Sequence, residues 1–304
     1  MKKALILVLA AMICLVAYYT WSFADGDFTS GNATITDEVE SIEIDWTSGS
    51  VTVAYHDENT VILEETSDRP INGDDRMRWK MDGKTLVVEY NTPALFRFFS
   101  PSKALTVTLP KGRNLKKAEI IATSADIRVP ELTAGEIALG STSGEVNATV
   151  SAPFVYGEST SGDVTLKVTG RTDQVKMGST SGRLNLTLEE AEKAELGTTS
   201  GGIILEAGNV KQADLGSTSG DIHVKAGAFE QMKINATSGS VNAELSANPG
   251  FTAKVSQTSG DFDSTLALAK NGDTWSCGDG SAKLEIGTTS GDVRLTELKE
   301  ESAK

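Results

Sequence analysis

Apolar and polar residues alternate on both sides of a short motif that recurs along most of this chain. The motif is a Thr-Ser pair followed by glycine. Its nine glycines are Gly49, Gly144, Gly162, Gly182, Gly201, Gly220, Gly239, Gly260 and Gly291. A degenerate copy ends at Ala125, and from there to Gly260 the copies follow one another at intervals of 18 to 21 residues. A repeat of this length is typical of proteins built from stacked structural units.

The residues around each glycine follow a period of two. Positions seven, five and three before the glycine, and two, four and six after it, carry mostly apolar or small side chains. Around Gly239 these residues are Met232, Ile234, Ala236, Val241, Ala243 and Leu245. The positions between them carry mainly Lys, Asp, Glu, Asn and Thr. Such alternation on both sides of a corner predicts two short β-strands per repeat, each with one buried face.

The Thr-Ser-Gly motif is interpreted as the corner between these two strands. Glycine adopts left-handed backbone conformations without a Cβ clash, and hydroxyl groups can bond to backbone groups that a bend leaves unpaired. One repeat offers too few apolar side chains to offset the entropy of ordering its own backbone. The coils must therefore stack in parallel. The sequence predicts an all-β, single-domain parallel β-helix, or β-solenoid, with coils of about 19 residues.

Two interruptions of the period mark the ends of this solenoid, which is predicted over residues 39–296. Between Tyr55 and Ala118 the chain remains strand-like, and Asp82-Gly83 indicates a hairpin turn. This stretch predicts an N-terminal hairpin excursion that covers the first coil and protects its edge. A second surplus, of about twelve residues at 269–281, predicts an insertion or closing excursion before the last coil.

Both interruptions contain candidate contact residues. Between Pro93 and Pro101, four apolar side chains surround a single arginine. They are Leu95, Phe96, Phe98 and Phe99. These side chains either fold over the open end of the solenoid as a cap or form an exposed apolar tip that contacts lipid or a partner protein. Trp275 is the candidate contact residue of the second interruption.

The beginning of the chain has the layout of an export signal. Lys2 and Lys3 precede an apolar stretch, and Ser22 and Ala24 supply small residues before a cleavage site, so residues 1–24 are predicted as a signal peptide. The same stretch is just long enough for an uncleaved membrane anchor. Either way, the protein is predicted to be exported: secreted, at the cell surface, or membrane-anchored and facing outside. A polar linker is predicted over residues 25–38 and a charged tail over 297–304.

Composition excludes several functions. The net charge of −14 makes nucleic acid an unfavourable partner. The two cysteines are Cys14, inside the export segment, and Cys277, so the mature body cannot form an internal disulfide. The only histidines are His56 and His223, and no metal-binding Cys/His spacing, nucleophile elbow or phosphate-binding glycine loop occurs. The sequence therefore indicates no catalytic residue, cofactor or metal and predicts that the protein is not an enzyme.

Stacking converts the corner positions into columns of side chains. Columns of threonine and serine can bind ice, glycans or ordered water, but we expect these hydroxyls to satisfy one another and the turn backbone. The residue after the glycine is acidic in six of ten copies. These are Asp126, Glu145, Asp163, Asp221, Asp261 and Asp292. Carboxylate columns can collect Ca²⁺, but Ser50, Arg183, Gly202 and Ser240 interrupt this one. No metal site is predicted from it.

Three stretches resemble the DUF4097 family, whose members are often labelled adhesins because of their shape. They are LGSTSGDIHV at 215–224, LTVTLPKG at 105–112 and GDGSAKLEIGTTSGDVRL at 278–295. The resemblance covers about residues 39–296. It implies a single-domain parallel β-helix, with right-handed winding expected, in bacterial proteins that are often exported or anchored. Some relatives belong to envelope-stress and antimicrobial-peptide response systems, and the family supplies no catalytic residues.

These observations support one main hypothesis and leave two open. The first is a non-enzymatic, extracytoplasmic surface protein with a role in adhesion or envelope-stress sensing, whose partner is a glycan or protein of the cell envelope. The N-terminal segment would add contact with the membrane if it is not cleaved. The alternatives are a glycan-active solenoid enzyme of the lyase or hydrolase kind, which uses outward carboxylates, and a spacer without a ligand.

Overall fold

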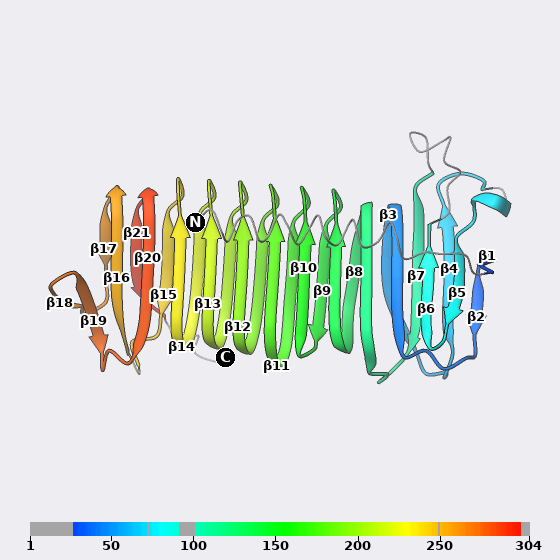
Figure 1. Ribbon diagram of the computed structural model, residues 1–304, viewed down its shortest axis with the longest axis horizontal. Helices are drawn as coiled ribbons and strands as arrows, with labels where there is room; N and C mark the ends of the chain where they lie inside the picture. The colour runs from blue at the N-terminus through cyan, green and yellow to red at the C-terminus, as the bar shows by residue number, and fades with distance from the viewer. Residues whose placement is uncertain (1–26, 72, 91–100, 249, 299–304) are drawn as a thin grey trace, which may run out of the picture.

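The computed structural model describes residues 27–71, 73–90, 101–248 and 250–298 of the 304-residue chain. Within these ranges the chain forms 21 β-strands and one short 3-10 helix, η1 (Gly73–Asp75). The strands stack side by side into an elongated solenoid (Figure 1). The predicted all-β solenoid is confirmed.

The strands fall into three groups along the solenoid. At the N-terminal end lie β1 (Thr29–Ser30), β2 (Ala33–Ile35), β3 (Ser41–His56), β4 (Val61–Ser67), β5 (Arg78–Asp82), β6 (Thr85–Glu89) and β7 (Lys103–Pro110). The central strands are β8 (Leu115–Ser141), β9 (Val146–Ser151), β10 (Phe154–Ser159), β11 (Val164–Ser179), β12 (Leu184–Thr198), β13 (Ile203–Ser217), β14 (Ile222–Ala236) and β15 (Val241–Leu245). The C-terminal group is β16 (Gly250–Ser259), β17 (Phe262–Ser264), β18 (Ala269–Asn271), β19 (Thr274–Gly278), β20 (Ala282–Ser290) and β21 (Val293–Glu297).

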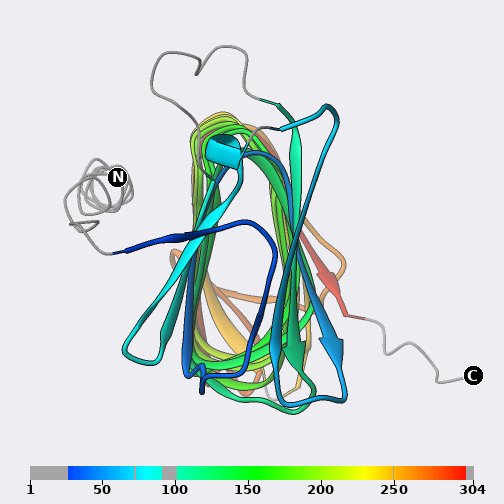
Figure 2. The same ribbon diagram turned by 90° about the vertical axis from the view of Figure 1, so that its right-hand side faces the viewer.

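The central coils stack in parallel and in register, so equivalent positions form columns. Ile203 of β13 lies between Leu184 of β12 and Ile222 of β14. Along β13, Ile203 and Leu205 are fully buried whereas Glu206 is exposed. Viewed along the stack, the coils superpose as a narrow ring with two long faces (Figure 2). The predicted period of two is confirmed, and it places one continuous apolar core inside the ring.

The corner glycines are required by the close approach of neighbouring coils. A Cβ atom on Gly220 would lie 1.9 Å from the carbonyl oxygen of Gly201 in the coil beside it. Among the nine motif glycines, positive φ angles occur only at Gly49 (107°) and Gly260 (115°). The predicted left-handed conformation is therefore wrong for the other seven. These positions exclude a side chain because the backbone of the next coil occupies its place.

A different hydroxyl from the predicted one satisfies the corner backbone. Ser217, three residues before the glycine, accepts a hydrogen bond from the N–H of Gly220 (2.8 Å) and donates one to the carbonyl of Gly201 (3.2 Å). Thr218 and Ser219 donate their backbone N–H groups to the previous coil. In the described ranges, the hydroxyls of the Thr-Ser pairs form no hydrogen bonds with the protein. The expectation that these columns satisfy the turn is thus wrong, and their hydroxyls face outward.

At the N-terminal end, the order of the coils in space differs from their order in sequence. The first half of β3 pairs with β6 on one side and β8 on the other, and its second half lies between β7 and β8. The coil of β6 and β7 therefore lies outside the first coil. Antiparallel β5 and β4 then pair with β6 and β7. The predicted hairpin excursion exists, but it covers this later coil instead of the first one.

Part of the predicted polar linker belongs to this end structure. The strands β1 and β2 pair antiparallel with β5 and β4, respectively. Ile35 is buried, and the side-chain oxygen of Asn32 accepts a hydrogen bond from the N–H of Glu65 (2.9 Å). The linker prediction for residues 25–38 is therefore wrong over 29–35, because short polar strands find backbone partners at an otherwise open sheet edge.

The C-terminal end repeats the inversion. The last coil of the sequence, β20 and β21, is inserted between the coil of β14 and β15 and the coil of β16 and β17. The surplus residues form the hairpin of β18 and β19, and β19 pairs antiparallel with β16. The predicted excursion is confirmed, but the coil that follows it does not lie at the tip. Returning between two coils gives both of its strands two parallel neighbours.

Candidate binding groove

Two adjoining hollows lie on the outer surface near the N-terminal end, with volumes of about 350 Å³ and 340 Å³. The first is lined by Gly49, Ser50, Thr66, Ser67, Asp68, Ser102, Lys103, Ala104, Asp126 and Arg128. The second is lined by Thr52, Asp126, Ile127, Arg128, Val129, Pro130, Glu145, Asn147 and Thr149. Since Asp126 and Arg128 border both hollows, we treat them as one groove, the Arg128 groove. Most of its lining residues carry hydroxyl, amide or charged groups, and the second hollow also has apolar surface, with Pro130 exposed.

An ion pair stands at the middle of the Arg128 groove. The guanidinium of Arg128 lies 2.7 Å from Oδ2 of Asp126, and about half of the arginine side chain is exposed (57%). Arg128 has Thr52 and Asn147 as neighbours in the adjacent coils. A guanidinium flanked by a hydroxyl and an amide presents both donors and acceptors to a ligand that lies across several coils.

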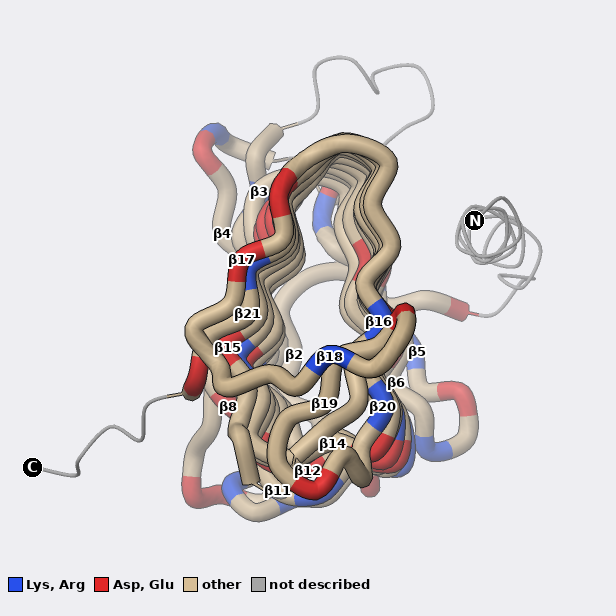
Figure 3. The backbone as a smooth tube through the Cα atoms, turned by 90° about the vertical axis from the view of Figure 1, so that its left-hand side faces the viewer, with Lys and Arg blue, Asp and Glu red and all other residues tan. Residues whose placement is uncertain are grey.

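The acidic column that contains Asp126 has a structural role. Oδ1 of Asp126 accepts a hydrogen bond from the N–H of Glu145 in the next coil (3.1 Å), and Oδ1 of Asp221 does the same for Ser240 (2.8 Å). Each carboxylate replaces a carbonyl where the strand ladder is interrupted at the corner. Acidic residues of successive coils lie in rows along the stack (Figure 3). Across the described residues, no group of three or more His, Cys, Asp or Glu side chains could hold a metal ion.

One rim of the groove is held by a reciprocal contact between β4 and β7. The N–H of Asp68 donates to the carbonyl of Ser102 (3.1 Å), and the N–H of Ser102 donates to Oδ1 of Asp68 (3.1 Å). These residues directly follow β4 and directly precede β7. The contact therefore fixes the edge of the groove where the antiparallel cover meets the outermost coil.

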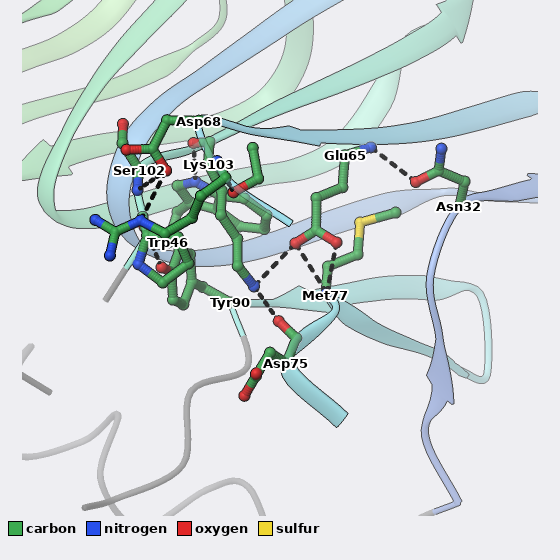
Figure 4. A network of polar contacts seen from close by, with 12 residues as sticks. Asn32, Trp46, Glu65, Asp68, Asp75, Met77, Tyr90, Ser102 and Lys103 are labelled. Carbon is green, nitrogen blue, oxygen red and sulfur yellow. Dashed lines mark hydrogen bonds and ion pairs between the residues drawn. The ribbon is translucent and has the colours of Figure 1, made fainter. Parts of the chain in front are cut away.

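Beneath this rim lies a buried charged network (Figure 4). Nζ of Lys103 lies 3.0 Å from Oε1 of Glu65, and neither side chain is more than 1% exposed. Both carboxylate oxygens of Glu65 accept the N–H of Met77, at 2.9 and 3.0 Å. The ammonium also donates to the carbonyl of Asp75 and lies 4.1 Å from the ring centre of Tyr90. The network joins β4, η1 and β7 to Tyr90, the residue directly after β6.

Two aromatic rings enclose the network. The indole N–H of Trp46 donates to the carbonyl of Lys103 (3.0 Å), and the Trp46 and Tyr90 rings meet edge to face at 5.1 Å. The hydroxyl of Tyr90 donates to the carbonyl of Pro101 (2.5 Å). These contacts exclude water from the ion pair and tie β3 to the outer coil.

Two carboxylates lie close together on the outer face of the same coils. Asp45 of β3 is the register partner of Glu89 of β6. Burial raises the pKa of Asp45, and the nearby Glu89 carboxylate raises it further. The guanidinium of Arg78 forms an ion pair with Oε2 of Glu89 at 2.6 Å. This contact stabilises the antiparallel pairing of β5 with β6.

The structure places the predicted contact residues as follows. Leu95, Phe96, Phe98 and Phe99 lie outside the described residues, so their role stays a prediction. Trp275 is half-buried in β19, with its ring 5.4 Å from Phe262 and 4.9 Å from Nζ of Lys270. It packs against the core at the C-terminal end, far from the Arg128 groove (Figure 1). Its role as a contact residue also stays a prediction.

Sequence reasoning did not identify the Arg128 groove. The available signal was the residue type at the third position after each corner, which faces outward. In the stack, Arg128 occupies this position between Thr52 and Asn147, which are shorter. The two histidines do not meet there or elsewhere: Nε2 of His56 lies 2.6 Å from the carbonyl of Thr60, whereas His223 is exposed on β14. In the part of the chain that the structure describes, no helix has the length and apolar character needed to cross a membrane.

Comparison with known proteins identifies the family. The family model Toastrack DUF4097 matches residues 39–296, the whole of the predicted solenoid. The chain belongs to the Toastrack DUF4097 family. A β-solenoid is the fold of the Toastrack domain. A search of curated proteins finds no relative of this Toastrack chain.

Solved structures of the same architecture have little sequence in common with it. A candidate lipid-binding protein from Parabacteroides distasonis is 14% identical, with 90% of this chain and 98% of that chain covered and a TM-score of 0.50. Candidate adhesins from Parabacteroides merdae and Bacteroides fragilis are 15% and 14% identical, cover 91% and 89% of this chain and 98% of their own, and give TM-scores of 0.46 and 0.43. The first comparison supports the Toastrack solenoid as the fold.

Proposed function

We propose that this Toastrack protein is a non-enzymatic, extracytoplasmic binding protein that holds a glycan of the cell envelope in the Arg128 groove. The observation that carries the proposal is the groove itself, an open and polar depression that crosses several coils and is centred on an exposed guanidinium. Its position outside the cytoplasm rests on the signal-like layout of residues 1–24.

The lining of the groove suits an extended, hydroxylated ligand. Thr52 lies on one side of the Arg128 coil, and Asn147 and Thr149 lie on the other. They provide hydroxyl and amide groups along coils that repeat at about the 4.8 Å spacing of β-strands. Such groups both donate and accept hydrogen bonds, as sugar hydroxyls do. Arg128 adds a charge-assisted donor for an acidic substituent. Of its apolar lining residues, Ile127 and Val129 are buried in the core and Pro130 alone is exposed, which makes a lipid tail a less suitable ligand.

The carboxylates of the groove support binding over catalysis. Asp126 accepts the N–H of Glu145 as well as the guanidinium of Arg128, and Asp68 accepts the N–H of Ser102. A general acid or base needs a side chain that is able to exchange protons with the substrate. Asp126 and Asp68 are instead occupied in holding corners of the fold, which leaves Glu145 as the one carboxylate of the groove without such a contact, whereas a glycosidase needs a pair. This observation favours the binding protein over the glycan-active enzyme.

The test compares two matched arginines. Arg128 and Arg294 both occupy the third position after a corner, both are about half exposed, and each pairs with an aspartate. Only Arg128 lines the groove. Titration of purified envelope glycan into the full chain should show saturable binding that Arg128→Ala weakens about tenfold, the loss of one charge-assisted contact of roughly 1.4 kcal/mol. Arg294→Ala should leave affinity unchanged.

Two results would contradict the proposal. Absence of saturable glycan binding, or equal loss in both variants, would remove the groove as the site. Release of shortened glycan chains during the titration would instead favour the enzyme hypothesis. Thermal unfolding of both variants provides the control, since removing an exposed arginine should leave the melting temperature close to that of the natural chain.

A further inference from the structure

The Lys103–Glu65 pair is unusual among the ion pairs of the described residues because both side chains are fully enclosed. Lys103 is 0% exposed and Glu65 1%, whereas every other pair has at least one side chain that is 40% or more exposed. Removing two charges from water costs several kcal/mol per ion. A pair enclosed in this way has only the partners that the protein supplies in place of water.

The contacts around the pair arrange it for a reaction. Nζ of Lys103 lies 3.0 Å from Oε1 of Glu65, so the amine is held next to the carboxyl group whose carbon it would attack. The N–H of Met77 points at both carboxylate oxygens, and the Asp75 carbonyl accepts another hydrogen from Nζ (Figure 4). The amine, the carbon that it can attack and a donor for the developing oxyanion are therefore held together.

We propose that Lys103 and Glu65 condense into an intramolecular amide, an isopeptide bond between Nζ and Cδ. In water, the free ammonium and carboxylate are favoured because both ions are well solvated. Inside the protein that solvation is lost, whereas a neutral amide is far less costly to bury. The rings of Trp46 and Tyr90 and the buried Met77 keep water away from the product.

The reaction balances without an added reagent. A proton passes from the Lys103 ammonium to the Glu65 carboxylate across the 3.0 Å contact. The freed lone pair of Nζ attacks Cδ and forms the C–N bond, and the N–H of Met77 stabilises the resulting oxyanion. Nζ then gives a second proton to the departing oxygen, the C–O bond breaks, and one water molecule leaves. One hydrogen remains on the amide nitrogen, and nothing is oxidised or reduced.

The bond would join β4 of the antiparallel cover to the start of β7 in the outermost coil. It would close a covalent ring through the η1 segment at the end of the solenoid. A disulfide cannot do this, because Cys277 is the only cysteine of the described residues and lies in β19 at the other end. The inference does not depend on the proposed glycan binding.

Mass spectrometry of the full chain, purified and denatured, tests the proposal. We expect a mass lower by one water molecule than the sequence between the observed termini requires, and a branched tryptic peptide that joins the segments containing residues 65 and 103. Lys103→Met should restore the full mass. Lys117→Met removes another lysine that pairs with a glutamate, at 2.6 Å but 40% exposed, and should retain the deficit.

Two outcomes would overturn the proposal, and neither depends on how well a variant folds. The first is a natural chain at its full sequence mass, with residues 65 and 103 recovered in separate linear peptides. The second is a mass deficit that persists in Lys103→Met, because the water would then have been lost elsewhere.

Discussion

The central coils and the N-terminal end of this solenoid are stabilised in different ways. In the centre, each coil repeats the contacts of its neighbour: the corner carbonyl of Gly201 occupies the space beside Gly220, and Ser217 bonds to both glycines. At the N-terminal end, contacts that occur once, among them the enclosed pair of Lys103 and Glu65, hold strands of opposite direction together.

This difference shows what a repeat can and cannot supply. Backbone ladders and small corner residues are sufficient wherever a coil has an identical coil on each side. A solenoid end has no such neighbour, so its exposed backbone must be covered by a structure with its own side-chain contacts. The N-terminal end has the larger cover, whereas at the C-terminal end β17 pairs with β21 alone within the described residues.

The largest effect should come from adding a side chain at a central corner. Gly220→Val would place Cβ 1.9 Å from the carbonyl oxygen of Gly201, so neighbouring coils would have to separate. We expect a loss of more than about 4 kcal/mol in the free energy of unfolding, or failure to fold. Chemical denaturation measures it.

A second glycine of the same coil is the matched control. A Cβ atom on Gly216 meets nothing within 4 Å. Gly216→Ala should therefore leave stability unchanged or raise it by up to about 1 kcal/mol, because alanine restricts the unfolded chain. If both substitutions had the same effect, close approach of the coils would not explain the corner glycines.

The next largest effect should come from breaking the enclosed pair at the N-terminal end. Lys103→Met leaves the Glu65 carboxylate buried without its ammonium, which costs about 3 to 5 kcal/mol. Hydrogen exchange of Lys103→Met should show the loss of protection in β4 and β7 first. Combining this substitution with Glu65→Leu removes the remaining charge and should recover the part of the loss that the unpaired carboxylate causes, since neither variant can form the proposed amide. If the double variant were as unstable as Lys103→Met, the unpaired carboxylate would not be the cause.

The smallest effect concerns pH. Hydrogen bonds from Lys116 and then Lys84 hold the pKa of Glu40, just before β3, at about 2 in the folded protein, compared with 4.5 for the free side chain. Because the folded value is the lower one, these contacts stabilise the fold above about pH 4.5 and are lost as the pH falls towards 2. The site is at the surface, so solvent screens the effect.

Hydrogen exchange between pH 5 and pH 2.5 measures this contribution at the N-terminal end. The natural chain should lose protection around β3 and β6 as the pH falls. Glu40→Gln, which cannot titrate, should show a smaller change. Equal changes in both proteins would show that other carboxylates cause the loss of protection.

The sequence was sufficient for the repeated part of the fold but not for its ends. Alternation around each glycine predicted strands whose buried and exposed residues agree with the structure along β13. The order of the coils could not be read in this way, because every coil presents nearly the same corner and any two of them can pair in register. Only the side chains in the two interruptions of the repeat distinguish one spatial order of the coils from another.

The candidate site was hidden for a related reason. A lysine such as Lys103 is normally solvent-exposed, and nothing in its sequence neighbourhood indicates Glu65 as a partner. That contact arises because β4 returns antiparallel over β7. Arg128 has the spacing of an ordinary outward-facing residue. It borders the first hollow because the ends of β4 and β7 form the opposite wall.

The inverted coil order restricts how the length of this protein can change. The first coil and the last coil of the sequence each have parallel neighbours on both sides. A further repeat fused before Ser41 or after Glu297 would find no free strand edge next to its point of attachment. A coil duplicated between Gly144 and Gly239 would meet equivalent neighbours above and below. This solenoid can therefore lengthen by internal duplication but not by extension at the ends of its first and last coils.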